Sequence, residues 1–182
     1  MHIHDLLVIG AGPAGLSAAL SAFDLGIENC LLLEKESKLG GRLIRKQEAA
    51  AGSVIFQKMM GSSAYLKHFM KTLSIYDLPT MTGQSVVRIS KDTKGSFAVY
   101  INEGKSPQCL CRKLIFAGGA DSLDCLSDLL AGAEPSETPL PGLYLVGDCL
   151  RRHVLPDYAS QAGAACGRKA AAALIAERHK KG

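Results

Sequence analysis

The sequence predicts an α/β domain with a central parallel sheet, a layer of helices and a β-meander. An apolar run at 5–9 is followed by the turn GAGPAG, a small-residue helix at 13–25 and a second apolar run at 30–34. A strand, a helix and a strand in this order form one parallel βαβ unit. Short alternating runs in the middle of the chain predict the meander, and a late strand followed by an Ala-rich helix completes the pattern.

After this unit, residues 35–62 are predicted to be loop, and residues 63–76 a helix. The helix is amphipathic because its apolar residues recur at helical spacing. These are Tyr65, Leu66, Phe69, Leu73 and Tyr76. Lys67 and Lys71 fall on the other side, so this helix should cover the core with one face only.

The meander is predicted from three alternating runs, at 85–90, 96–102 and 110–117, which polar turns separate. A short helix at 123–130 and a Pro-rich connection follow. The apolar segment LYLVG then predicts a last strand, and the small residues after it predict a helix at 159–177.

The chain has 182 residues, of which 47% are hydrophobic, and this is enough for one core. We therefore expect a single domain over 1–182, with 118–141 as a short connection. The net charge of +4 comes partly from the basic segment 178–181, which is typical of a solvated end rather than a nucleic-acid contact.

The longest apolar stretch, residues 6–23, is interrupted by Gly-Pro, so it predicts a buried strand and helix rather than a membrane span or a signal peptide. We expect a cytoplasmic protein. The six cysteines form no CxxC and no metal pattern with the histidines, which favours reduced, buried thiols. A redox role for Cys109 and Cys111, which share one face of a strand, is the alternative.

The turn GAGPAG carries the chemistry of a Rossmann-like nucleotide site. Gly10 permits the tight turn, Gly12 lets a pyrophosphate approach the backbone, and Gly15 lets the helix pack closely on the strands. The helix start favours an anion. Glu34, at the end of the second strand, is placed to accept hydrogen bonds from a ribose and to repel the extra phosphate of NADP.

A second glycine cluster, LYLVGDC at 143–149, lies far downstream. The Asp148 carboxylate can accept from a sugar hydroxyl, and Gly147 allows the backbone to approach a ligand. With the first motif, this cluster indicates FAD.

With these pieces in order, the chain resembles the FAD domain of the thioredoxin reductase family, within the two-dinucleotide-binding flavoproteins. The resemblance covers essentially the whole chain. The segments that carry it are GAGPAG with Glu34, KLGGR, the Gly83, Val86, Ile89 pattern leading into FAVYI, KLIFAGGA and LPGLYLVGDC.

The resemblance implies that Gly40, Gly41 and Arg42 line the pyrophosphate and ribityl region. It also implies that Val86 contacts the adenine through its backbone. The start of the last helix, near Ser160, would face the flavin. The predicted cofactor-binding residues are Gly10, Gly12, Pro13, Ala14, Gly15, Glu34, Lys35, Gly40, Gly41, Arg42, Val86, Ala117, Gly118, Gly119, Gly147, Asp148, Gln161 and Ala162.

Three features of the sequence differ from the family. Arg42 replaces a polar, uncharged residue, as in the amine-oxidase and desaturase branch, where the arginine contacts phosphate. The segment 156–158 stands where the family has an arginine-glutamine pair. Between Gly119 and Pro141 the family inserts an NADPH domain with the redox CxxC; neither is in this sequence, so we expect that the chain cannot catalyse the thioredoxin reductase reaction alone.

Three segments could line the open face of the flavin: the basic 45–47, the apolar and Met-containing 54–60, and 151–153. The first segment is more commonly a solvated basic loop, and the second more commonly packs in the core. In the third, His153 is the candidate proton donor, because an imidazole titrates near neutral pH. Cys149 is also near the flavin, but a residue after a buried strand usually packs in the core.

The leading hypothesis is a single-domain FAD-dependent oxidoreductase whose electron donor is NAD(P)H or a redox protein. The alternatives are an electron-transfer or regulatory subunit that is active only in a complex, and a small-molecule oxidase or desaturase. A homodimer that covers the flavin is compatible with each hypothesis. We predict no nucleic-acid, membrane or metal partner.

Overall fold

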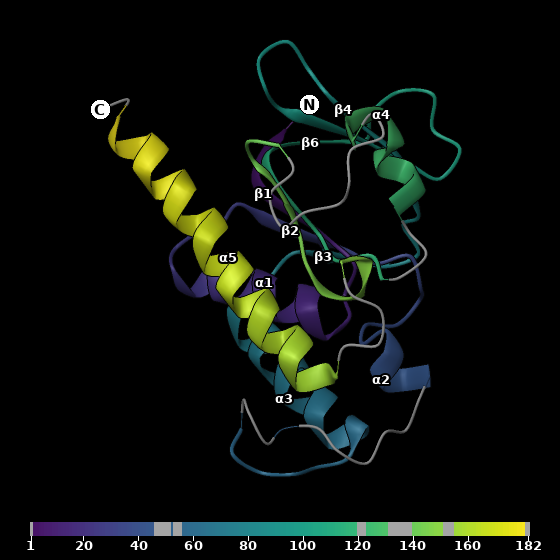
Figure 1. Ribbon diagram of the computed structural model, residues 1–182, viewed down its shortest axis with the longest axis vertical. Helices are drawn as coiled ribbons and strands as arrows, with labels where there is room; N and C mark the ends of the chain where they lie inside the picture. The colour runs from purple at the N-terminus through teal and green to yellow at the C-terminus, as the bar shows by residue number, and fades with distance from the viewer. Residues whose placement is uncertain are drawn as a thin grey trace.

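Figure 1 shows the chain as a computed structural model, which describes residues 2–45, 52, 56–119, 123–130, 140–150 and 155–180. The strands are β1 (Ile3–Ile9), β2 (Cys30–Leu33), β3 (Thr80–Met81), β4 (Val86–Lys91), β5 (Phe97–Ile101), β6 (Cys109–Phe116) and β7 (Leu143–Leu145). The α-helices are α1 (Pro13–Asp24), α2 (Arg42–Arg45), α3 (Ser62–Tyr76), α4 (Ser127–Leu130) and α5 (Pro156–His179). Two 3₁₀ turns, η1 (Leu123–Leu126) and η2 (Gly147–Cys149), complete the description.

The strands form one sheet in the order β3-β2-β1-β6-β5-β4, and β7 also pairs with β6. β1, β2, β3, β6 and β7 are parallel, whereas β4, β5 and β6 form an antiparallel meander. One edge of β6 is shared: its start pairs with β5, and its end, at 114–116, pairs with β7. The predicted parallel sheet, helix layer and meander are confirmed.

Alternation along the strands divides the core into two layers, because successive side chains of a strand point to opposite faces. Leu6, Val8 and Ile115 pack on one face with the helices α1, α3 and α5. Leu7 and Phe116 pack on the other face with the meander and η1. The helices therefore cover one face of the sheet, and the side chains of the other face form a second apolar layer with those of the meander and η1.

The helices α1 and α5 lie side by side (Figure 1) and approach closely through glycine. A Cβ added at Gly163 would lie 2.0 Å from the Ala14 carbonyl oxygen, and one added at Gly167 would lie 2.1 Å from that of Ala18. No larger residue fits at either position without moving a helix. This contact places the start of α5 beside the start of α1.

Some elements differ from the prediction. The helix α5 begins at Pro156 rather than near 159, because a proline suits the first helical position, where no N–H is needed. The two-residue strand β3 and the one-turn helix α2 were not predicted. β3 exists through its pairing with Leu32 and Leu33, a tertiary contact that local sequence does not show.

Candidate functional site

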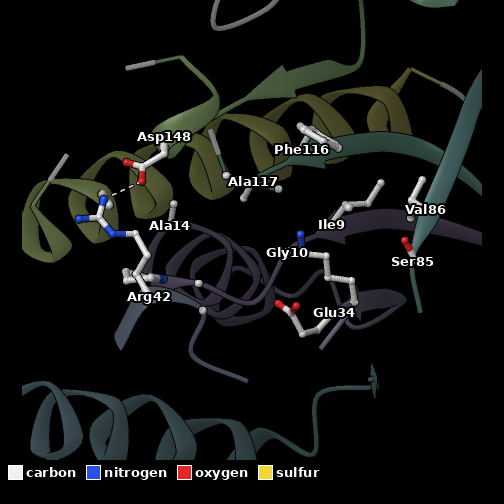
Figure 2. A pocket seen from close by; sticks show the side chains of 18 of the residues that line it. Ile9, Gly10, Ala14, Glu34, Arg42, Ser85, Val86, Phe116, Ala117 and Asp148 are labelled. Atoms are coloured by element: carbon white, nitrogen blue, oxygen red, sulfur yellow. Dashed lines mark hydrogen bonds and ion pairs between the residues drawn. The ribbon is translucent and has the colours of Figure 1, made fainter. Parts of the chain in front are cut away.

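A pocket of about 400 Å³ lies at the carboxyl ends of β1, β2, β6 and β7. In this sheet β2 and β3 lie on one side of β1, and β6, β5 and β4 lie on the other. The switch point, where α/β sheets hold their ligands, is therefore between β1 and β6. The volume is within the ~300–1,000 Å³ usual for small-molecule sites. Figure 2 shows Arg42 and Asp148 on one side of the pocket, and Ser85 and Val86 on the other.

The glycine turn that follows β1 is held by contacts that exclude side chains. Gly10 has a φ of +97°, and a Cβ there would lie 2.4 Å from the carbonyl oxygen of Ala117. A Cβ at Gly15 would lie 1.7 Å from the Gly10 oxygen. By contrast, a Cβ at Gly12 would meet no described atom within 4 Å, so it would point into open space at the start of α1.

The start of α1 can bind an anion. Gly12 is the N-cap residue and has no side chain with which to cap the helix, and Pro13 follows in the first turn. The first-turn N–H groups of a helix have no partner within the helix, and they carry the positive end of its dipole. The first turn of α1 contains no acidic side chain that would repel an anion.

Glu34, at the end of β2, is buried with 5% of its surface exposed. The N–H of Ala11 donates to its Oε2 over 2.7 Å, and the N–H of Glu36 donates to its Oε1 over 2.9 Å. These two bonds fix the carboxylate against the pocket. Each oxygen can accept a further hydrogen bond, so the group is a fixed acceptor.

Arg42 and Asp148 form an ion pair, in which the Arg42 Nη1 donates to Asp148 Oδ2 over 2.8 Å. Gly147 turns the chain with a φ of +84°, and a Cβ there would lie 3.1 Å from the Ala14 Cβ. η2 is thereby brought directly beside α1, and Asp148 forms part of the pocket wall.

The structure brings most of the predicted cofactor-binding residues together. The predicted residues that line the pocket are Gly10, Gly12, Pro13, Ala14, Glu34, Lys35, Gly41, Arg42, Val86, Ala117, Gly118, Gly119, Gly147 and Asp148. Gly15 and Gly40 support the walls instead. The Gly40 N–H donates to the Ala11 oxygen over 2.8 Å, and a Cβ at Gly40 would lie 2.7 Å from Leu66 Cδ2.

Gln161 and Ala162, in contrast, do not line the pocket. Because α5 begins at Pro156, these two residues lie in its second turn and are exposed, so their N–H groups are not at the helix start. The α5 residues that line the pocket are Pro156 and Ala159.

The catalytic candidate His153 lies outside the described residues, as do 46–47, 54–55 and 151–152. Cys149 is described and packs as expected: it is buried, and its thiol donates to the Val146 carbonyl oxygen over 3.2 Å. Burial raises the pKa of the Cys149 thiol to about 11. Burial also raises the pKa of Cys109 and of Cys111, which disfavours their thiolate forms.

Several pocket residues were not predicted. They are Ile9, Gln84, Ser85, Val87, Phe116, Asp124, Cys125, Pro156 and Ala159. Arg45, which belongs to a segment predicted as a possible lining of the flavin face, also lines the pocket. Position at a strand end could have identified Ile9 and Phe116. β4 has a register shift between Val86 and Arg88, and both Val86 and Val87 line the pocket. Nothing in the local sequence indicates this shift.

Residues 5–75 match the family described as FAD binding domain. Ferredoxin–NADP reductase 3 of Lysinibacillus sphaericus is 26% identical over 136 residues, which are 75% of this chain and 38% of that protein. The chain thus spans about two fifths of the length of this relative.

Solved structures agree with this match at the level of the fold. The bacillithiol disulfide reductase Bdr (YpdA) of Staphylococcus aureus has a TM-score of 0.53 at 20% identity, over 65% of this chain and 39% of that chain. OTEMO in complex with FAD and NADP has a TM-score of 0.51 at 17% identity, over 64% of this chain and 25% of that chain. Among the described residues, no helix has the length and apolar character needed to span a membrane.

Proposed function

We propose, from the premise that this chain carries an FAD-binding domain of the thioredoxin reductase-like kind, that it holds FAD extended along the pocket and serves an oxidoreductase. The electron donor that we propose is NAD(P)H or a redox protein. One observation carries the proposal: a helix start without a capping side chain and a fixed carboxylate line the same pocket at the switch point of the sheet.

The adenosine is assigned to the end of the pocket with Glu34 and Val86. Two backbone N–H groups hold the Glu34 carboxylate in place, so it can accept from the 2′-OH and 3′-OH of a ribose without reorganising. The same negative charge opposes a 2′-phosphate. Gln84 and Ser85 line this end beside Val86.

The diphosphate is assigned to the start of α1. The open space at Gly12 admits an anion close to the backbone, and the helix dipole stabilises it. Lys35, Arg42 and Arg45 line the same pocket and add positive charge. These groups fit FAD, because its two phosphates carry the negative charge that the site is built to hold.

The ribityl chain and flavin are assigned to the end with Asp148 and the start of α5. The Asp148 carboxylate would accept from a ribityl hydroxyl, and Pro156 and Ala159 would line the flavin side. The bound flavin would supply the electron transfer. The first-turn N–H groups of α5 would stabilise negative charge placed before them. His153, which we keep as a candidate proton donor, is close to this end in sequence.

We also propose that residues 1–182 form one domain, with 118–141 joining the two parts of the FAD site directly. A second candidate, a subunit that is active only in a complex, is supported by Leu155 and Tyr158. They are 54% and 55% exposed on either side of Pro156, where a partner could cover them.

The test is anaerobic reduction of the FAD-loaded protein. We expect that NADH, NADPH or reduced ferredoxin bleaches the visible flavin absorption, with a clear preference among the three. A stoichiometric partner that co-purifies and is needed for bleaching would favour the subunit. A bound flavin that none of the donors reduces, with or without a partner, would contradict the oxidoreductase proposal.

A further inference from the structure

An ion pair joins two pocket walls that are far apart in the sequence. Arg42 begins α2 directly after the Gly40–Gly41 turn, and Asp148 lies in η2 after β7. Their side chains meet over 2.8 Å, and Figure 2 shows the pair beside Ala14, in the first turn of α1. We call this pair the clasp.

Both walls are held by their backbones. The Gly40 N–H donates to the Ala11 oxygen over 2.8 Å, and a Cβ at Gly41 would lie 3.1 Å from the Gly12 Cα. On the other wall, Gly147 packs against Ala14. These contacts tie the backbone of both walls to the turn and first turn of α1, so the parts that can change rotamer across the passage are the two charged side chains.

The clasp is partly shielded from solvent. The exposed fractions of the side chains are 31% for Arg42 and 14% for Asp148. Such a pair is stronger than one between fully exposed groups, whose contribution is small. The arginine has five N–H donors in a planar fork, so it can hold Asp148 and also present N–H groups to a phosphate.

We propose that the clasp is a gate on the FAD pocket, and that Arg42 is the residue that positions Asp148 within it. A dinucleotide that runs from Val86 to the start of α5 passes the clasp, so the ion pair must open when the ligand enters and again when it leaves. This inference depends on the FAD-binding function proposed above.

A rate measurement separates the gate from simple attraction of the diphosphate. FAD is mixed rapidly with the flavin-free wild-type chain, R42Q and R45Q, and flavin fluorescence gives the association and dissociation rates. Arg45 is the matched control, since it lies on the same helix and lines the pocket. Its Nη1 lies 3.9 Å from the Glu36 Oε1, so it also forms an ion pair. The gate predicts that R42Q binds and releases FAD about fivefold faster, a factor that corresponds to an ion pair of about 1 kcal/mol. R45Q should bind more slowly, because it only loses attractive charge.

Slower association in R42Q, as in R45Q, would overturn the gate and leave Arg42 as an anion-binding residue. In a D148N background the gate predicts that R42Q no longer speeds association; an undiminished gain would overturn it as well. If R42Q does not fold by circular dichroism, D148N alone replaces it. This variant removes the ion pair and keeps the Arg42 charge, so faster association supports the gate and an unchanged rate contradicts it. A folded wild-type chain that gives no FAD signal is a different result, which would overturn the proposed function.

Discussion

The two ends of the parallel strands use charge and backbone in opposite ways. At the carboxyl ends, glycine turns and a helix start present N–H groups and open space to the pocket. Nearer the amino ends, Asp5 of β1, Arg112 and Lys113 of β6, and Glu177 and Arg178 of α5 pair with one another. The first end is arranged for a ligand, whereas the second satisfies its own charges and fastens the last helix to the sheet. Substitutions at the two ends should therefore separate FAD binding from stability.

The largest expected effect is at Gly12. In G12D the new side chain enters open space and caps α1, so the free energy of unfolding should hold or rise slightly. Its carboxylate occupies the proposed diphosphate position, and like charges this close cost several kcal/mol. We expect FAD affinity to fall about 1,000-fold, or about 4 kcal/mol, measured by fluorescence titration.

Gly61 is the matched control, since it is the N-cap of α3 and a Cβ there also meets no described atom within 4 Å. G61D should leave FAD affinity unchanged. Equal losses in G12D and G61D would contradict the assignment of the diphosphate to the start of α1.

At the contact of α1 with α5, helix propensity and packing predict opposite changes in the free energy of unfolding. Gly to Ala within a helix normally stabilises by about 1 kcal/mol. In G163A the Cβ would lie 2.0 Å from the Ala14 oxygen, so we expect a net loss of about 2 kcal/mol in urea unfolding and weaker FAD binding, because Ala14 lines the pocket.

The control is A165G, at an exposed position of the same helix. A165G should lower the free energy of unfolding by at most about 1 kcal/mol and leave FAD affinity unchanged. A stabilised G163A would show that the helices are not packed as described.

Glu34 tests the adenosine end. In E34Q an amide replaces one carboxylate oxygen and faces a backbone N–H, so one buried hydrogen bond and the charge are lost. We expect FAD to bind about tenfold more weakly by calorimetry, a loss of about 1.4 kcal/mol. E36Q is the control, because the Glu36 side chain is exposed and only its backbone N–H contacts Glu34. An equal loss in both variants would remove the special role of the buried carboxylate.

The smallest effect is expected at the charged cluster near the amino ends. Burial alone would raise the pKa of Glu177, but hydrogen bonds from Lys113 and Arg112 outweigh it and hold the pKa below its usual 4.5. The contribution of ionised Glu177 to the free energy of unfolding is therefore present above pH 4.5, and it is lost as the pH falls through the lowered pKa. E177Q should lose at most about 1 kcal/mol at pH 7 and nothing at low pH, in urea unfolding followed across pH.

FAD affinity should not change in E177Q, and E103Q, at an exposed position, serves as the control for removal of a carboxylate. A loss of FAD binding in E177Q would contradict the separation of the two ends.

The comparison also explains which features could be predicted from the sequence. The glycine turn and Glu34 are local: spacing and the preceding strand are enough to locate them. The same holds for Gly147 and Asp148. The pairing of Asp148 with Arg42 joins residues that are 106 positions apart, and no local pattern indicates it.

Two other features were missed for different reasons. The start of α5 was predicted too late, although Pro156 is itself a signal for a first helical turn. The presence of Asp124 and Cys125 in the pocket depends on how η1 packs against β4, which is a tertiary contact. Backbone-based parts of a site are thus easier to predict from sequence than walls that long-range packing brings together.

The most direct test of the central claim is a calorimetric titration of FAD into the flavin-free wild-type chain, followed by gel filtration and an absorption spectrum of the protein peak. The account predicts one FAD per chain and a yellow protein that keeps its flavin. A folded chain that takes up no heat and elutes colourless would contradict it.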